Sequence, residues 1–257
     1  MTDLSLNLLD EVSIGLFAGA PCAYEAPVAS RLIPYLEWNW LRAAGQALPP
    51  VGAQGDLRFI QSALRNKLVQ SIGQDASAGV QCVRRNHTDD QNANWLLFLE
   101  KLRRGCVGSG LLPDFAGQLA GVVKEMEENI HWHSRRVSSG LVAFLSRENV
   151  FEFVVLDRGA GVLRTLRSNV EFENLVDHTE ALSVAVDIRN SRFGTHSGRG
   201  YGFLDLMTGI ANSKALIRLR SGDGMLEMDG TGAERIPFHL AQRASGKGFL
   251  IAVSVHP

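Results

Sequence analysis

Residues 153–161 read Phe153-Val-Val-Leu-Asp157-Arg-Gly159-Ala-Gly161. The four apolar residues at the start predict a buried strand. The two glycines predict a tight turn directly after it, because glycine adopts backbone conformations that are closed to other residues. Asp157 therefore stands at the end of the strand, where its carboxylate forms the floor of a candidate pocket. The alternative is an ordinary tight turn, which explains many Asp-x-Gly-x-Gly strings.

A long helix is predicted upstream of this strand, with Asp114 as its cap. At about 100° per residue, Glu125, Asn129 and His133 stack along one side of that helix, next to its apolar stripe. We expect these polar side chains to be half buried and therefore to need partners. A surface Glu/Asn pair is the alternative. The apolar stripe consists of Phe115, Leu119, Val122, Met126 and Ile130.

A second glycine-rich stretch, Ser197-Gly198-Arg199-Gly200-Tyr-Gly202, lies downstream and leads into a predicted helix over residues 200–212. The free backbone N–H groups at a helix N-terminus attract phosphate. The spacing differs from that of a Rossmann fingerprint, and no Gly-Lys-Ser/Thr string of a Walker A loop follows. The segment before it, residues 162–197, contains one predicted helix over 179–188 and has the length of a mobile lid.

The remaining predicted elements of residues 111–257 are strands. A polar turn joins residues 140–146 and 150–156 into a hairpin. Further strands are expected at 215–220, 225–229 and 249–255. Helices on one face of such an antiparallel sheet give an α+β fold, a two-layer α/β sandwich.

The first hundred residues carry no recognised motif and are interpreted as a separate α/β or helical module, residues 1–105. Helices are predicted over 28–44 and 57–68, and strands over 12–17 and 80–83. A glycine-containing linker is expected at 105–110. The aromatic residues of this region are interpreted as core side chains rather than a ligand platform: Trp38, Trp40, Phe59 and Trp95.

The helix motif, the Asp-x-Gly-x-Gly turn and the glycine-rich loop occur in an order that resembles the Bergerat-fold (GHKL) ATPases. This superfamily includes gyrase, heat-shock chaperones, histidine kinases and mismatch-repair ATPases. The resemblance covers roughly residues 111–257. It implies a domain that binds ATP with Mg²⁺.

The resemblance also implies a role for individual residues. Asn129 matches the Mg²⁺ ligand of the family, and Glu125 matches the general base. Asp157 matches the residue that accepts the adenine amino proton, while Gly159 and Gly161 let the backbone approach the base. The remaining positions expected to contact nucleotide are His133, Gly198, Arg199, Gly200, Gly202 and, in a Gly-Thr-Gly turn, Thr231. Arginines of the predicted lid are further candidates for phosphate contacts.

The spelling Glu-x-x-x-Asn-x-x-x-His is most similar to the anti-sigma-factor serine kinases, whereas sensor histidine kinases usually lack the Glu. Trp132 occupies the position at which gyrase-type enzymes carry an acidic residue, which counts against a topoisomerase or repair role. The leading interpretation is a regulatory ATPase or serine/threonine protein kinase that acts on a partner protein. The alternatives are an ATP-gated binding module without turnover and an ATPase component of a multi-protein defence or DNA-transaction complex.

Composition limits the partners and the compartment. The formal net charge of the 257 residues is −1, so nucleic acid is not an expected partner. No signal peptide and no apolar run of membrane-spanning length is recognised, so a cytoplasmic protein without a membrane partner is expected. Three widely spaced cysteines predict free thiols rather than a disulfide framework or a zinc site. His131 and His133 point away from each other on a helix and cannot chelate one ion. The oligomeric state stays open, with a homodimer among the alternatives.

Overall fold

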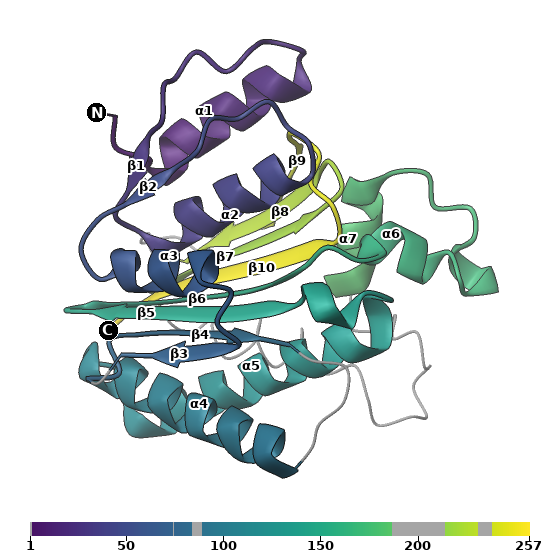
Figure 1. The fold of residues 1–257 in the computed structure, drawn as a ribbon. Helices are drawn as coiled ribbons and strands as arrows, with labels where there is room; N and C mark the ends of the chain where they lie inside the picture. Colours follow the sequence, from purple (N-terminus) through teal and green to yellow (C-terminus); the bar gives the residue numbers. More distant parts are fainter. Residues whose placement is uncertain (1, 74, 84–88, 187–213, 231–237) are drawn as a thin grey trace.

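The computed structural model describes residues 2–73, 75–83, 89–186, 214–230 and 238–257 (Figure 1). Within these residues, one eight-stranded sheet forms the centre, in the order β3-β4-β5-β6-β10-β7-β8-β9, and every neighbouring pair is antiparallel. The strands are β3 (Gln70–Ile72), β4 (Ala78–Cys82), β5 (Leu141–Arg147), β6 (Val150–Asp157), β7 (Lys214–Ser221), β8 (Gly224–Asp229), β9 (His239–Gln242) and β10 (Phe249–His256).

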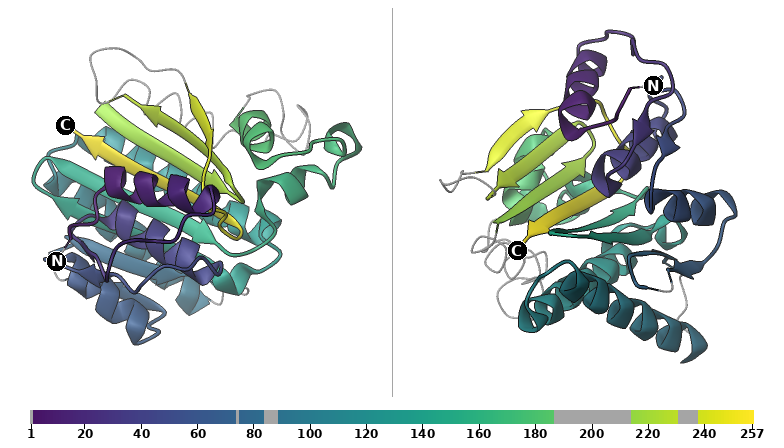
Figure 2. Two further views of the ribbon diagram at one scale, coloured as in Figure 1. Left: turned by 90° about the horizontal axis from the view of Figure 1, so that it is seen from above. Right: turned by 90° about the vertical axis from the view of Figure 1, so that its left-hand side faces the viewer.

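Helices cover both faces of this sheet, as Figures 1 and 2 show. One face carries α1 (Leu6–Phe17), α2 (Leu32–Ala43) and α3 (Leu57–Arg65). The other face carries α4 (Asp89–Gly108), α5 (Pro113–His133) and α7 (His178–Val186). The short elements are β1 (Val28–Ala29), β2 (Gly52–Ala53), α6 (Gly161–Leu166) and the 3-10 helices η1 (Val137–Ser139) and η2 (Val170–Phe172).

The mixed α/β composition and the large antiparallel sheet agree with the predicted α+β class. The two-layer arrangement was predicted for residues 111–257 alone, whose described helices α5 and α7 lie on one face of the sheet. The first helices form a third layer on the sheet. The central strand β6 explains why. Its residues Phe153 and Val155 pack in the core with α4 and α5, whereas Val154 and Leu156 pack in the core with α1, α2 and α3. A strand that is apolar on both faces must be covered on both faces.

Within the described part of residues 111–257, most of the predicted helices and strands are present. The hairpin is β5 and β6, and the later strands are β7, β8 and β10. The predicted helix at 179–188 is α7. Helix α5 begins with Pro113 after Leu112, so Asp114 lies in its first turn and does not cap it. Proline suits the first position of a helix, because it has no backbone N–H and its fixed φ angle is already helical.

For the first hundred residues, one predicted element is wrong and several are confirmed. Residues 12–17 were predicted as a strand but belong to helix α1, in which Leu9 and Val12 are buried. Helices α2 and α3 and strand β4 overlap the predicted ranges, although Val28 and Ala29 form strand β1 instead of the start of a helix. The aromatic residues are core side chains as expected: Trp38 and Trp40 are buried on the α2 face and Trp95 on the α4 face, with Phe59 packed at the edge of the first cluster.

The hydrogen-bonded sheet crosses the predicted boundary between residues 105 and 111. Strand β4, from the first hundred residues, pairs with β5 from Ala78↔Leu145 to Cys82↔Leu141. The predicted linker is also partly helical, since α4 continues to Gly108. Gly105 lies where the helix approaches the sheet closely: a Cβ there would meet the Ala76 carbonyl oxygen at 2.5 Å. This glycine therefore allows close packing and does not end the helix.

A cluster of buried charges lies between the α2 layer and the sheet. Arg218 and Arg220 are two residues apart on β7, so both point to the same face, and neither has any exposed surface. Glu37 of α2, also fully buried, pairs with both guanidinium groups, with 2.8 Å between Glu37 Oε2 and Arg218 Nε. Asp10 of α1 and Glu227 of β8 complete the surroundings of Arg218.

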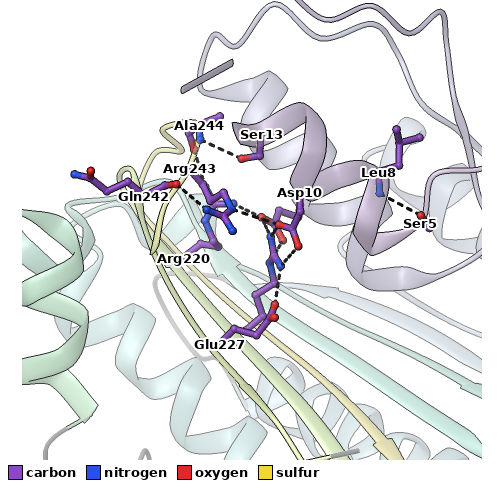
Figure 3. A network of polar contacts seen from close by, with 11 residues as sticks. Ser5, Leu8, Asp10, Ser13, Arg220, Glu227, Gln242, Arg243 and Ala244 are labelled. Atoms are coloured by element: carbon purple, nitrogen blue, oxygen red, sulfur yellow. Dashed lines mark hydrogen bonds and ion pairs between the residues drawn. The ribbon is translucent and has the colours of Figure 1, made fainter. Parts of the chain in front are cut away.

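The cluster is electrically balanced. Figure 3 shows Asp10 turned from α1 toward Arg220, Glu227 and Arg243 on the sheet side. Three carboxylates thus meet three guanidinium groups. Burial alone would raise the pKa of Asp10, but its hydrogen bond to Arg218 and the nearby arginines hold that pKa below the ordinary value.

A second polar contact fixes the N-terminus of α2. The Glu152 carboxylate of β6 is almost fully buried, and it accepts the Leu32 backbone N–H at 3.0 Å. It also pairs with Arg31 Nε at 3.0 Å. A carboxylate at a helix N-terminus satisfies an otherwise unpaired backbone donor. Helix α2 is therefore held to the sheet at its start by Glu152 and at mid-length by Glu37.

The structure also bears on the predictions about membrane spans and cysteines. Among the described residues, no helix has the length and apolar character that crossing a membrane requires. Cys22, Cys82 and Cys106 form no disulfide bond among the described residues. Only Cys106 is buried, and this burial raises the pKa of its thiol to about 12.

Replacing Glu37 is expected to destabilise the fold strongly. In Glu37→Gln the Arg218 and Arg220 guanidinium groups lose their shared buried carboxylate, and breaking a buried pair in this way costs about 3–5 kcal/mol. The measurement is the free energy of unfolding by denaturant. Glu100→Gln is the matched control, because Glu100 pairs with Arg103 and Arg104 on an exposed face of α4. It should leave stability nearly unchanged. Equal effects of the two variants would contradict a central role for the buried cluster.

Candidate functional site

Asp157 is the last residue of β6 and is 5% exposed. It follows Phe153 and Val155 at two-residue spacing, so its side chain lies on the α5 face of the sheet. Its Oδ1 accepts the Gly159 backbone N–H at 2.6 Å, and the Ser134 hydroxyl also hydrogen-bonds the carboxylate. No lysine or arginine among the described residues forms an ion pair with it. The strand end therefore presents a buried carboxylate held by neutral donors.

The turn after Asp157 packs against the end of α5. Ala160 N–H donates to the Ser134 carbonyl oxygen at 2.8 Å, and a Cβ on Gly159 would lie 1.9 Å from that oxygen. Gly161 has a φ of +74°, a conformation that favours glycine. Both glycines of the predicted motif are therefore required by the geometry, the first for contact with Ser134 and the second for its backbone angle.

Helix α6 leaves directly from this turn, an element that was not expected from the sequence. The Val162 backbone N–H donates to the Ser221 Oγ of β7 at 2.9 Å. The Thr165 hydroxyl lies 2.8 Å from the Gly161 carbonyl oxygen and 3.4 Å from that of His133. The end of α5, the Asp157 turn and the start of α6 thus meet at one end of the sheet.

The predicted polar stripe of α5 has the expected burial. Glu125, Asn129 and His133 are each half buried along one flank of the helix, while Met126 and Ile130 enter the core. The stripe runs toward Ser134, the residue that hydrogen-bonds Asp157. The structure therefore aligns Glu125, Asn129 and His133 on a helix that ends at the Asp157 turn.

The other flank of α5 carries a different pair. His131 Nε2 lies 2.8 Å from the Glu127 carboxylate, which is 5% exposed. Trp132, in contrast, is 57% exposed. Within the described residues, no group of three or more His, Cys, Asp or Glu side chains gathers into a metal site. A cation at α5 would therefore depend on few protein ligands and on oxygen atoms from a bound molecule.

The layer on the opposite face also reaches this turn. The Trp40 indole N–H of α2 donates to the Asp157 carbonyl oxygen at 3.2 Å. The turn before β10 closes the same corner, since a Cβ on Gly248 would lie 2.4 Å from that oxygen. Asp157 is thus contacted through its carboxylate from the α5 layer and through its carbonyl from the α2 layer.

Burial is the dominant influence on the Asp157 carboxyl group. It raises the pKa of Asp157 above the ordinary value, although the hydrogen bonds from Gly159 and Ser134 act in the opposite direction. Ionised Asp157 is therefore costly to the fold. A raised carboxyl pKa in a buried position next to a turn is a common property of functional sites.

Several predicted site residues lie outside the described residues: Gly198, Arg199, Gly200, Gly202 and Thr231. The predicted helix over 200–212 and two of the lid arginines, Arg189 and Arg192, also lie outside them. Of the arginines that the structure describes in this segment, Arg164 and Arg167 are exposed, and Arg167 Nε donates to the Leu175 carbonyl oxygen at 2.6 Å.

Sequence reasoning missed Ser134, Gly248 and Trp40. Ser134 directly follows the helix motif, and its position next to His133 could have indicated a contact at the helix end. Gly248 precedes the last strand and could have been read as a close approach. Trp40 carried no local signal, because it is 117 residues from Asp157 in sequence.

Comparison with known proteins adds no assignment: no family model, curated protein or solved structure matches the chain. The geometry of the site is therefore the basis for interpreting its function.

Removing the Asp157 charge is expected to leave the free protein at least as stable as wild type at neutral pH. The raised pKa means that the folded state binds this proton more tightly than the unfolded chain. Ionisation of Asp157 therefore lowers the free energy of unfolding at a pH above the raised pKa. This loss of stability decreases as the pH falls from the raised pKa to the ordinary value of an Asp. The measurement is the free energy of unfolding of Asp157→Asn and wild type at pH 7 and at successively lower pH, where the difference should shrink.

Asp75→Asn is the matched control for this prediction. The Asp75 Oδ1 accepts the Ser77 N–H at 3.0 Å, the same local geometry as in Asp157, but Asp75 is exposed. The hydrogen bonds to Ser77 lower the pKa of Asp75, so its charge favours folding at neutral pH. A clear loss of stability in Asp157→Asn, similar to that in Asp75→Asn, would indicate that Asp157 only closes a turn.

Proposed function

We propose that the chain is a cytoplasmic, Mg²⁺-dependent ATP-binding protein of the Bergerat type. It acts as a regulatory ATPase or a serine/threonine protein kinase toward a partner protein. The observation that carries this proposal is the buried Asp157 carboxylate at the junction of β6, the end of α5 and the start of α6. The resemblance of the motifs is the basis for naming ATP as the ligand. The contact of the Asp157 turn with Ser134, at the end of the α5 motif, supports a single site for these two motifs. The glycine-rich loop over residues 197–202 lies outside the described residues.

The Asp157 carboxylate suits the amino group of adenine. A carboxylate accepts hydrogen bonds and donates none while it is ionised. Adenine presents an amino group at the position where guanine presents a carbonyl oxygen. An acceptor at the pocket floor therefore favours adenine, and a bound amino N–H would offset part of the cost of the buried charge.

The length of α5 suits the rest of the nucleotide. A helix rises 1.5 Å per residue, so Asn129 lies about 7.5 Å and Glu125 about 13.5 Å from Ser134 along the axis. A base at Asp157 would thus direct its ribose and phosphates along the half-buried stripe. Asn129 would contribute its amide oxygen to Mg²⁺, an ion that prefers oxygen ligands and usually takes several of them from phosphates and water. Bound Mg²⁺ would neutralise phosphate charge.

Glu125 is the proposed general base. A carboxylate within hydrogen-bond reach of a water molecule or a serine hydroxyl takes its proton as the phosphoryl group is transferred. In hydrolysis the acceptor is water, and in the kinase reaction it is a hydroxyl of the partner. Glu125 is half buried, which limits its solvation and favours a base role over that of a surface carboxylate.

Asp157→Asn is expected to weaken ATP binding about tenfold or more. The substitution keeps the shape but places an amide donor where an acceptor is needed, and an unsatisfied polar contact costs roughly 1–3 kcal/mol. The measurement is calorimetric titration of wild type and variant with ATP in the presence of Mg²⁺. Asp75→Asn, which changes an exposed Asp with the same local hydrogen bond, should bind as wild type does. Unchanged affinity in a folded Asp157→Asn would exclude Asp157 from the adenine site.

Glu125→Ala separates catalysis from binding without turnover. If Glu125 is the general base, the variant binds ATP with nearly wild-type affinity and loses about 10²–10⁴-fold in turnover. Turnover is measured as ADP formation by the protein alone and as phosphate transfer to an added candidate partner. Glu128→Ala is the matched control on the same helix, because Glu128 is exposed and pairs only weakly with Lys124. Equal turnover of the two variants would support an ATP-gated binding module instead.

A further inference from the structure

We propose that Trp40 is a positioning residue for Asp157, so that the α2 layer sets adenine recognition from the opposite face of the sheet. The inference rests on the proposed function, because it concerns the same site. It assigns a role in nucleotide binding to the first part of the chain, for which the sequence offered no motif.

The bond from Trp40 acts on the peptide that follows Asp157. Trp40 is 2% exposed, and its indole N–H donates to the Asp157 carbonyl oxygen at 3.2 Å. That carbonyl belongs to the peptide joining Asp157 to Arg158, so its direction fixes the angle at which the turn leaves the strand. In the same turn, the Gly159 N–H donates a hydrogen bond to the Asp157 carboxylate at 2.6 Å. Rotation of this peptide would therefore move the carboxylate and its donor together.

The Trp40 ring is itself fixed from several sides. A Cβ on Gly246 would lie 1.8 Å from the ring, so this glycine packs directly against it. The Arg220 guanidinium lies 5.8 Å from the ring centroid, within the range of a cation–π contact. Arg220 is held in turn by Glu37, three residues before Trp40 on the same helix. The buried charge cluster thus fixes the ring that fixes the Asp157 peptide.

Trp38 provides a matched comparison within the same helix. It is fully buried, and its indole N–H also donates to a backbone carbonyl, that of Pro49 at 2.8 Å. Pro49 lies in the first part of the chain, between α2 and β2. Trp→Phe at either position removes one buried indole donor and keeps an aromatic ring. Only the change at Trp40 touches the Asp157 peptide.

The experiment compares Trp40→Phe, Trp38→Phe and wild type by calorimetric titration with Mg·ATP and with Mg·GTP, alongside thermal unfolding. We expect Trp40→Phe to bind ATP about three- to tenfold more weakly, the effect of one lost hydrogen bond. Its preference for ATP over GTP should also narrow, because the base-selecting carboxylate is less well held. Trp38→Phe should lose similar thermal stability but keep the ATP affinity and the nucleotide preference of wild type.

A second readout uses the wild-type protein and remains valid if Trp40→Phe does not fold. The four indole N–H resonances are assigned by single Trp→Phe variants at positions 38, 95 and 132, which leaves Trp40 by elimination. Saturation with Mg·ATP should shift the Trp40 resonance more than that of Trp38. If wild type binds ATP, this inference alone is overturned by either of two results: equal shifts of the Trp40 and Trp38 resonances, or equal ATP affinity of Trp40→Phe and Trp38→Phe. Absence of ATP binding by wild type overturns the proposed function and this inference with it.

Discussion

The ion pairs between Glu37 and the two buried arginines of β7 are the contact on which the arrangement of the layers depends. Arg218 and Arg220 have no exposed surface, so their charges must be neutralised inside the protein. The carboxylates that do so come mainly from α1 and α2. If α1 and α2 separated from the sheet, the Arg218 and Arg220 guanidinium groups would lose these carboxylate partners. A buried network of this kind specifies one packing of the layers more than it adds to net stability.

This packing brings both layers to the candidate site. From one face, Ser134 at the end of α5 contacts the carboxylate and the turn at Asp157. From the other face, Trp40 contacts the carbonyl of the same residue. The central strand thus carries Asp157 to a point that is held from both sides. A binding group held in this way loses little conformational freedom when a ligand arrives, which favours affinity. The cost is a buried carboxylate whose charge is disfavoured by burial, and a hydrogen bond from the proposed ligand would offset part of this cost.

Patterns that act over short distances were predicted from the sequence, and contacts between remote segments were not. The hairpin, helix α5 and its half-buried stripe follow from apolar periodicity and the intervening polar turn. The third layer was missed although Phe153, Val154 and Val155 are apolar in succession, which indicates a strand covered on both faces. The sequence of β7 gave no sign that it is covered on both faces, because Arg218 and Arg220 alternate with apolar residues as in a strand with one face in water. Trp40 could not be assigned, since no local pattern records a partner 117 residues away.

The central claim is that adenine binds against Asp157 with its phosphates along α5. The most direct test is a crystal structure with Mg²⁺ and a non-hydrolysable ATP analogue. The account predicts the adenine amino group within hydrogen-bond distance of the Asp157 carboxylate, Mg²⁺ coordinated by the Asn129 amide oxygen, and Glu125 beside the terminal phosphate. A nucleotide bound elsewhere, or bound with its base turned away from Asp157, would contradict it.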